Sequence, residues 1–525
     1  MDALLLIPIA LPMLAGMSLL LSSFRESLAG NGRLREDGGR ADADGGEKAG
    51  RIHLFVGVAL FLSVTMALVM AGAGEKRFVL FTFLDAVPIF FHIDAVGGLF
   101  VTVTSVVWLM ATFYSFVYMK HEGEEKRFFG FWLLSYGVLV GLDFSGNLVT
   151  MYLFYELTTL VSMPLVLHSG SREAVMAALK YLFYSMCGAY GGLFGIYFLY
   201  RYCGSLEFVP GGTLDVAAAQ GHEGILLVAV FAMLVGFGAK AGMLPLHAWL
   251  PTAHPVAPSP ASAALSGIIA KAGVLAVIRV VFYLVGPAFI KGTWVQYAWM
   301  TLTLLTVFMG SMLAFREKIF KKRLAYSTVS QVSYILFGLS LLTTDAMTGA
   351  LLHVAVHAAA KCGLFLTAGV FLYQYGFTKA DQLAGIGKRM PKTMWCYTIL
   401  SLALIGIPPA GGFVSKWYLA QGALQSPTGI FSWLGPVALL VSALLTAGYL
   451  LPVALKGFFT EKTEVDLPEP AKAEPAKAEP AKAEPAFCML LPIAVLAALA
   501  LLIGVIPNPL VRYVSDIARA VLDHV

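Results

Sequence analysis

The stretch GFGAKAGMLPLHAWLPTAHPVAPSPASAAL, from Gly236 to Leu265, decides the fold of this chain. It begins inside an apolar run, ILLVAVFAMLVGFGA, that is suited to crossing a bilayer, and it places Lys240 near the middle of that crossing. Prolines and histidines follow, and proline interrupts a helix because it lacks the backbone N–H and clashes with the preceding turn. We therefore expect segment 224–255 to be a broken membrane helix with an ionisable group beside the break.

The chain as a whole has the composition of a polytopic membrane protein. Of its 525 residues, 58% are apolar and 13% are charged, whereas soluble domains carry about 25% charged residues. Because roughly 20 apolar residues cross the hydrocarbon core, we count about fourteen spanning segments. The expected segments are 3–23, 52–73, 94–119, 128–145, 147–168, 175–203, 224–255, 261–286, 294–314, 324–342, 345–375, 394–424, 431–456 and 487–507. Segment 394–424 also contains internal Gly and Pro and is the second expected broken helix.

The short loops predict the orientation of the chain. Lys and Arg occur in loops 120–127, 315–323 and 379–392, whereas the intervening loops 204–224, 343–347 and 425–429 contain neither. Since short loops rich in Lys and Arg stay in the cytoplasm, we expect both termini outside. The repetitive tract LPEPAKAEPAKAEPAKAEPA (467–486) then lies in the cytoplasm, and its composition is typical of a semi-rigid tether.

Redox chemistry finds no support in the sequence. The five cysteines lie singly, without the C-x-x-C spacing of an iron–sulfur cluster or a zinc site. The chain also lacks the glycine-rich phosphate loops of nucleotide sites. We therefore predict no cofactor and no metal, and no electron transfer by this chain alone.

Ionisable residues at membrane depth are the candidate functional groups, because each costs a few kcal/mol or more in a bilayer. They are Glu156, Lys240, Lys271, His353, His357, Lys361 and Lys416. The spacing of 353, 357 and 361 places three of them on one helix face over about 12 Å, as expected for a proton wire. Two simpler interpretations stay open: Lys271 could extend toward the interface, and His357 alone could be a satisfied core histidine.

Four further charges lie near the ends of expected helices. They are Asp94, Asp143, Lys180 and Arg279. We interpret them mostly as interfacial charges, although Lys180 could point inward.

These residues carry a resemblance to a known family. The run KAGMLPLHAWLPTAHPVAPSPASAALSGIIAKAG (240–273) resembles the signature of the antiporter-like subunits shared by respiratory complex I, membrane-bound hydrogenases and Mrp-type cation/proton antiporters. FYELTTLVSMPLV is similar to the family's glutamate helix, LLHVAVHAAAKCGLFLTAG to its histidine helix and GIPPAGGFVSKWYL to its second broken helix. The similarity covers roughly residues 90 to 457, and the pattern is nearest to the D-type subunit of Mrp antiporters.

The resemblance implies an all-α integral membrane protein of about 14 transmembrane helices. It implies two inverted five-helix repeats at 127–290 and 291–457, each with one broken helix near the membrane midplane. An N-terminal three-helix segment (1–126), the linker (458–486) and a C-terminal helix with its tail (487–525) would flank them. The residues assigned to the breaks are Pro245, His247, Pro251, His254, Pro408 and Pro409.

The resemblance also implies a proton-translocating subunit of a multisubunit complex in a prokaryotic inner membrane. Glu156 and Lys240 would form the charge pair of one half-channel, with Lys271 as the relay from it. His353, His357 and Lys361 would form the central axis, and Lys416 would be the terminal site of the second half-channel. The implied partners are other membrane subunits, with or without a peripheral redox module, and protons, with or without Na⁺, but no nucleic acid. A self-sufficient cation/proton antiporter and a quinone-binding redox subunit are the alternatives.

Overall fold

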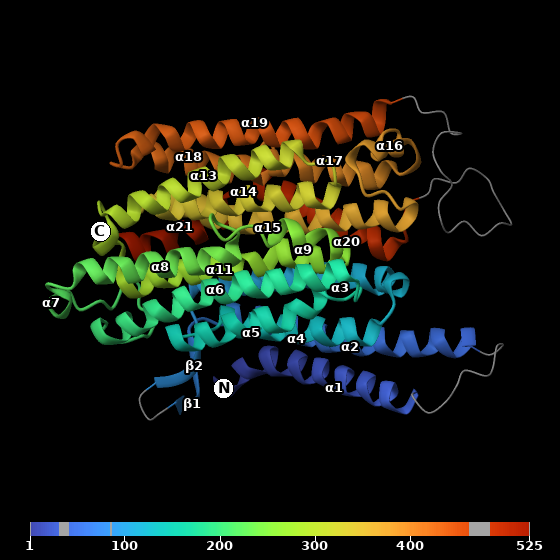
Figure 1. The fold of residues 1–525 in the computed structure, drawn as a ribbon, viewed down its shortest axis with the longest axis horizontal. Helices are drawn as coiled ribbons and strands as arrows, with labels where there is room; N and C mark the ends of the chain where they lie inside the picture. Colours follow the sequence, from blue (N-terminus) through green and yellow to red (C-terminus); the bar gives the residue numbers. More distant parts are fainter. Residues whose placement is uncertain (1, 31–40, 84–86, 461–483, 524–525) are drawn as a thin grey trace.

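The computed structural model describes residues 2–30, 41–83, 87–460 and 484–523. Within these residues the chain is a bundle of helices that run nearly parallel to one long axis (Figure 1). The α-helices are α1 (Ile7–Gly30), α2 (Ala41–Gly72), α3 (Ala95–Glu122), α4 (Glu125–Asp143), α5 (Leu148–Val166), α6 (Arg172–Tyr202), α7 (Val216–Ala219), α8 (Glu223–Ala241), α9 (Leu250–Val256), α10 (Ser259–Ala264), α11 (Ala270–Val280), α12 (Pro287–Ile290), α13 (Trp294–Arg316), α14 (Phe320–Ser340), α15 (Thr344–Tyr375), α16 (Ile386–Arg389), α17 (Pro391–Ile405), α18 (Gly411–Gln425), α19 (Ile430–Phe459), α20 (Phe487–Val505) and α21 (Asn508–Leu522). Short 3-10 helices occupy Asp2–Leu6 and Ala380–Leu383, and π-helical turns occupy Leu265–Ile269 and Val281–Val285.

Among the described residues, 11 helices are long and apolar enough to cross a membrane. The expected segments 128–145 and 324–342 are the helices α4 and α14, and each has three charged residues among its first four. The expected segment 394–424 is divided between α17 and α18, which have 15 residues each. The chain is thus a multi-pass helical membrane protein.

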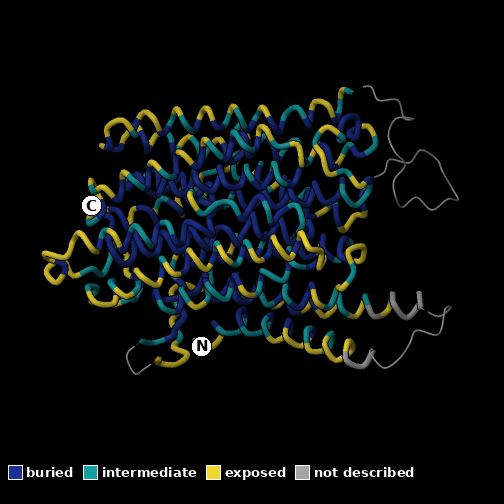
Figure 2. The backbone as a smooth tube through the Cα atoms, viewed as in Figure 1, coloured by how far each residue is buried: buried dark blue, intermediate teal, exposed yellow. Residues whose placement is uncertain are grey.

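Two spans lie at the centre of the bundle. The most apolar part of the continuous span Ser259–Val285 is 100% buried, and that of α15 is 94% buried. Figure 2 shows the buried residues running through the middle of the bundle, with exposed residues on the outer helices. Side chains of α11 and α15 therefore face protein on nearly all sides.

The helical path is interrupted at both expected places. α8 ends at Ala241, where Gly242 takes a φ of 79°, and helix resumes only at Leu250. α17 ends at Ile405 beside Gly406, with a φ of 90°, and α18 begins at Gly411. A left-handed φ favours glycine because a side chain would clash with the backbone, which explains the glycine after each first half-helix.

The expectation of an all-α chain omitted one element. β1 (Lys76–Phe83) and β2 (Val87–Ile93) form an antiparallel hairpin between α2 and α3. Its strands, KRFVLFTF and VPIFFHI, are rich in the aromatic and β-branched residues that favour strands. Asp94 follows β2 directly and caps α3, since its Oδ1 accepts a hydrogen bond of 2.9 Å from the Gly97 N–H.

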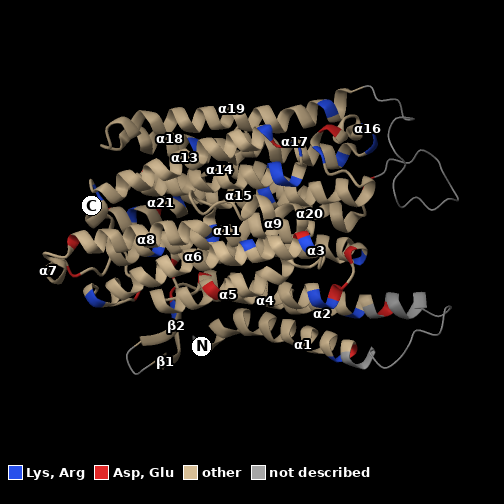
Figure 3. Cartoon of the chain, viewed as in Figure 1, with Lys and Arg blue, Asp and Glu red and all other residues tan. Residues whose placement is uncertain are grey.

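The two ends of the bundle differ in charge. Loops 120–127, 315–323 and 379–392 lie at the end that holds α16, which we call the basic end. The opposite end holds the β1–β2 hairpin, α7 and α21, and we call it the hairpin end. Figure 3 shows many Lys and Arg residues near the basic end and only a few inside the bundle.

Candidate functional site

Lys240 and Glu156 lie on adjacent helices without forming a direct ion pair. The Lys240 side chain is fully buried, and its Nζ donates a hydrogen bond of 2.5 Å to the Tyr155 carbonyl oxygen. The same ammonium lies 3.6 Å from the centre of the Tyr155 ring, as in a cation–π contact. Oε1 of Glu156 is buried without a hydrogen-bond partner among the described residues. Tyr155, which directly precedes Glu156 on α5, is thus the residue through which this part of α5 contacts Lys240.

Lys271 joins the two central spans. Its Nζ donates to the Ser266 carbonyl oxygen at 2.7 Å and lies 2.6 Å from His357 Nδ1 on α15. Both side chains are buried, with exposed fractions of 3% and 0%. Lys271 therefore points inward, so the interpretation of a lysine extended to the interface is wrong.

His353, His357 and Lys361 lie along one side of α15 as the spacing predicts. The two imidazole rings have centroids 5.8 Å apart. His353 also lies 2.9 Å from Ser415 Oγ on α18 and 3.1 Å from Gln331 Oε1 on α14. Lys361 donates to the Leu324 carbonyl oxygen at 2.9 Å and contacts Ser327 Oγ. His353 thus contacts both α18 and α14, whereas Lys361 contacts α14.

Lys416 is half-buried on α18, just beyond the second break. Its Nζ donates to the carbonyl oxygens of Leu404 and Ile405, each at 2.8 Å. These carbonyls belong to the last turn of α17, where the break leaves backbone acceptors without helical partners. The ammonium also lies 5.0 Å from the centre of the Tyr334 ring. Ser415, its neighbour in sequence, connects this position to His353.

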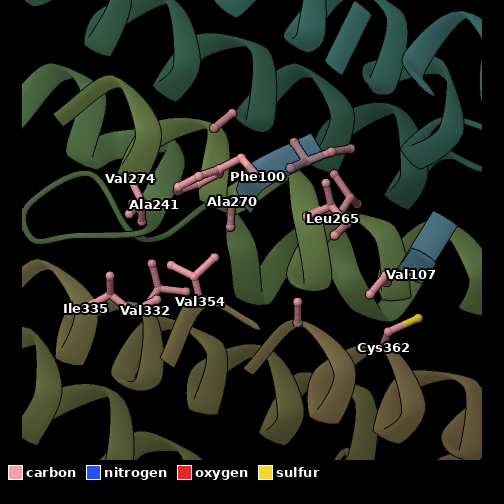
Figure 4. Close-up of a cluster of buried hydrophobic side chains, with 14 of the residues drawn as sticks. Phe100, Val107, Ala241, Leu265, Ala270, Val274, Val332, Ile335, Val354 and Cys362 are labelled. Atoms are coloured by element: carbon pink, nitrogen blue, oxygen red, sulfur yellow. The ribbon is translucent and has the colours of Figure 1, made fainter. Parts of the chain in front are cut away.

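A buried apolar cluster includes the sequence neighbours of Lys240 and His353. Figure 4 shows Ala241 and Val274 facing Val332, Ile335 and Val354 within one buried cluster. Ala241 follows Lys240 in sequence, and Val354 follows His353. Among the described residues, no hydrogen bond joins Lys240 to Lys271 directly.

The residues assigned to the breaks do not share one environment. Pro251 and His254 are buried, and the His254 ring stacks on Phe365 with centroids 4.5 Å apart. Both ring nitrogens of His254 lack a hydrogen-bond partner among the described residues. His247 is half-buried. Pro245, Pro408 and Pro409 are exposed on the surface of this chain. Both breaks therefore reach the surface of this chain at these prolines.

Two of the four charges interpreted as interfacial are buried. Arg279 is 1% exposed and forms an ion pair with Asp94, with Nη1–Oδ2 and Nη2–Oδ1 distances of 2.5 and 2.7 Å. Asp143 is 3% exposed and accepts a hydrogen bond of 3.0 Å from Thr104 Oγ1. Lys180 is half-buried on α6. Proximity to a helix end does not expose these two residues, because the hairpin covers the end of α4 and the loop before α8 covers the turn that follows α11.

Two residues that contact the predicted site or its broken helix were not predicted from the sequence. Tyr155 contacts Lys240 through both its ring and its carbonyl oxygen. Lys321, near the start of α14, is 9% exposed and donates a hydrogen bond of 2.7 Å to the Ala257 carbonyl oxygen. Lys321 lies in the basic loop region KIFKKR, where a buried lysine cannot be told from its exposed neighbours by composition.

Comparisons with known proteins agree with this architecture. A family model described as NADH:quinone oxidoreductase/Mrp antiporter, TM, matches residues 145–446. The N-type subunit of the NADH-quinone oxidoreductase of Desulforudis audaxviator is 32% identical over 435 residues, which are 81% of this chain and 84% of that protein. The D-type subunit of the Na⁺/H⁺ antiporter of Alkalihalophilus pseudofirmus is 28% identical over 436 residues, which are 82% of this chain and 83% of that protein.

A solved structure shows the same fold. A chain of the Mrp complex from a Dietzia species aligns with a TM-score of 0.80 and 22% identity, over 100% of this chain and 98% of that chain. The matched family region covers more than half of the chain and contains both breaks and all the predicted proton-site residues. The chain therefore belongs to the NADH:quinone oxidoreductase/Mrp antiporter transmembrane family.

Proposed function

We propose that this chain conducts protons across the membrane as one subunit of a multisubunit complex. The observation that carries the proposal is the contact of 2.6 Å between Lys271 and His357, which joins the two most buried spans of the bundle. Burying a lysine and a histidine in an apolar core is costly, so their presence there indicates a function. Together they provide a donor and an acceptor for one proton.

Three of the buried lysines have hydrogen-bond partners that allow the lysine to release its proton. Lys271, Lys361 and Lys416 donate to backbone carbonyl oxygens, and none has a carboxylate within ion-pair distance among the described residues. A carbonyl oxygen accepts a hydrogen bond from either the ammonium or the neutral amine. Each lysine can therefore gain or lose its proton without leaving a charged partner behind.

Coupling between the sites would be electrostatic. Two unit charges about 10 Å apart interact by roughly 1.7 kcal/mol at an effective dielectric constant of about 20. A change of charge on Lys240, as Glu156 or its own proton moves, would alter the protonation of Lys271 by a comparable free energy. In this mechanism protons move through side chains and water, with no covalent chemistry and no cofactor in this chain.

We further propose that the helices form two inverted five-helix repeats, at 127–290 and 291–457. The first would contain α4, α5, α6, α8 with α9, and α10 with α11; the second would contain α13, α14, α15, α17 with α18, and α19. Each set has one interrupted helix with a lysine beside the interruption, which supports the assignment. Counting each interrupted helix as one crossing, these ten crossings with α1, α2, α3 and α20 would total about fourteen.

Relatives of this chain belong to more than one type of complex. The relatives include a subunit of an NADH-quinone oxidoreductase and a subunit of a Na⁺/H⁺ antiporter. Similarity to the second supports a second candidate, in which proton movement is exchanged for Na⁺. Both candidates place the chain in a prokaryotic inner membrane with other membrane subunits.

The test uses the complex purified through a tag on this chain and reconstituted into liposomes. We expect Lys271→Ala to reduce proton transport on the order of a hundredfold, because its methyl group carries no proton. Lys180→Ala is the matched control, since Lys180 is a half-buried lysine on α6 and is not among the predicted proton-site residues. This variant should transport protons normally. Full transport by assembled Lys271→Ala would exclude the central relay. A proton flux that requires opposing Na⁺ at constant ionic strength would favour exchange over proton conduction.

A further inference from the structure

A buried carboxylate at the hairpin end has no role in the pathway described above. Asp143 is the last residue of α4, and its side chain faces α3, where Thr104 Oγ1 donates to Oδ2 at 3.0 Å. Among the described residues no cation lies within ion-pair distance of it, because Arg279 is engaged by Asp94. Burying a carboxylate without an ion pair is costly, so its presence calls for a function.

One cavity is lined by both Asp143 and Lys271. It measures about 10 Å³, which is close to the room that one water molecule needs. Asp143 and Thr104 line it on one side, and Lys271 and Gly267 line it on another. The remaining lining side chains are apolar, so Asp143 and Lys271 are the two ionisable groups on its wall.

The backbone near Lys271 is irregular in a way that suits a side chain with two positions. The π-helical turn Leu265–Ile269 directly precedes the helical turn that carries Lys271. Such turns are frequent at functional sites because they widen the helix locally. In the observed position the Lys271 ammonium bonds to Ser266 and His357. Lys271 also lines the cavity. Its flexible four-carbon stem allows rotation to direct the ammonium toward Asp143.

The surroundings of Asp143 lead outward to the hairpin end. The charged and titratable groups that face it are Arg279 and Lys271 on α11, Asp94 before α3, and Tyr136 on its own helix. Arg279 is close enough for its charge to act on Asp143, and its guanidinium is held in place by Asp94. The side chain of Asp94 is 15% exposed and thus reaches the surface, whereas the side chain of its partner Arg279 is buried.

We propose that Asp143 is a proton-carrying residue that links Lys271 to the hairpin end of the bundle. The Lys271 ammonium breaks one N–H bond and gives its proton to a water molecule in the cavity. That water passes a proton to the Asp143 carboxylate, so a neutral amine and a neutral carboxylic acid result. The acid then releases its proton to water beside the Asp94–Arg279 pair. This branch rests on the proposed proton conduction and adds an exit from Lys271 that does not pass through Lys416.

The test replaces Asp143 by Asn, which keeps the shape but cannot carry a proton, and measures proton transport by the reconstituted complex. We expect a loss on the order of a hundredfold, with partial recovery in Asp143→Glu. Asp516→Asn is the control: this carboxylate lies on α21, is 73% exposed, and should leave transport unchanged. The second measurement is the carboxylic-acid band in infrared difference spectra after a pH jump, which should be present in the wild type and absent in Asp143→Asn.

The outcomes separate this branch from the proposed function. If the wild-type complex moves no protons, proton conduction itself fails. If the wild type and Asp143→Asn transport equally, conduction stands and the branch is overturned. Should Asp143→Asn not assemble, Thr104→Val replaces it, because it removes only the hydrogen bond to the carboxylate. A shifted carboxylic-acid band in Thr104→Val supports the branch, and an unchanged band overturns it.

Discussion

The buried lysines are held by backbone oxygens, and this choice of partner has consequences for each residue. Lys361 donates to the Leu324 carbonyl and contacts Ser327, both on α14. A carboxylate partner would hold the ammonium in its charged form, whereas a carbonyl or hydroxyl also tolerates the neutral amine. A residue that replaces Lys361 without loss of proton transport must therefore be able both to gain and to release a proton.

Replacement of Lys361 tests whether it titrates. We expect Lys361→Ala to abolish proton transport, because a methyl group neither carries a proton nor influences its neighbours. Lys361→Arg should fail as well, since guanidinium stays protonated at any working pH. Lys361→His should restore part of the activity with a changed pH optimum. The measurement is proton uptake after a pH jump in proteoliposomes, and full activity of the Arg variant would leave only a fixed structural charge.

Tyr155 allows the ring and the backbone contact of Lys240 to be distinguished. A cation–π contact at a desolvated site contributes about 1 to 2 kcal/mol, so we expect Tyr155→Leu to lower transport roughly fivefold or more. Tyr155→Phe is the matched control, because it keeps the ring 3.6 Å from the ammonium. The backbone hydrogen bond is present in both variants. Equal transport by the Leu and Phe variants would show that the ring contributes nothing to the Lys240 site.

Sequence reasoning located candidate residues better than it judged their surroundings. His353, His357 and Lys361 were found because helical spacing places them on one face, and periodicity is visible in one sequence. Asp143 and Arg279 were assigned to the interface because they lie near expected helix ends. Their burial depends on a hairpin and on loops that are distant in sequence, and no local pattern reports such contacts.

At the scale of elements, the breaks and the hairpin show the same contrast. Gly and Pro marked both interruptions, because their backbone restrictions act locally. The β1–β2 hairpin was missed although its strands are rich in aromatic and β-branched residues, because periodicity alone does not tell a short apolar strand from part of a helix.

The linker makes a specific contact where the described chain resumes. Residues 467–483 of the repetitive tract lie outside the described residues, so the assignment of the tract as a tether stays a prediction. Glu484 accepts hydrogen bonds from the Lys392 N–H at 2.6 Å and from Thr393 Oγ1 at 2.7 Å. Its carboxylate thus caps the N-terminus of α17, where a negative charge is favourable.

Two changes in the linker should therefore behave differently. Deleting residues 471–475, one AKAEP repeat, should leave transport unchanged, because a tether needs only sufficient length. Glu484→Ala removes the cap and should destabilise the complex by about 1 kcal/mol. Thermal unfolding of the detergent-solubilised complex measures the second effect, with the repeat deletion as the control. A loss of transport in the correctly assembled deletion variant would mean that the repeats bind a partner.

At the scale of the molecule, the two candidate half-channels are not equivalent. Lys240 lies just before its break and is fully buried, whereas Lys416 lies just after its break and is half-buried. The surface at Lys416 and at the exposed prolines of the breaks is where other subunits would complete the pathway. We expect this chain alone in liposomes to transport few protons, and the assembled complex to transport at full rate. Cation-coupled proton exchange by the isolated chain would identify a self-sufficient antiporter instead.

The exposed break between α8 and α9 also bears on how the protein is made. Residues 244–248 are partly unwound, and Pro245 faces the outside of this chain. Irregular backbone of this kind is costly against lipid hydrocarbon, because its polar groups have no water to bind. A newly inserted copy that has not yet bound its neighbouring subunit thus exposes irregular backbone to the lipid. Cells that synthesise this subunit in excess over its neighbours should degrade the surplus, so the abundance of the partner sets how much of this chain survives.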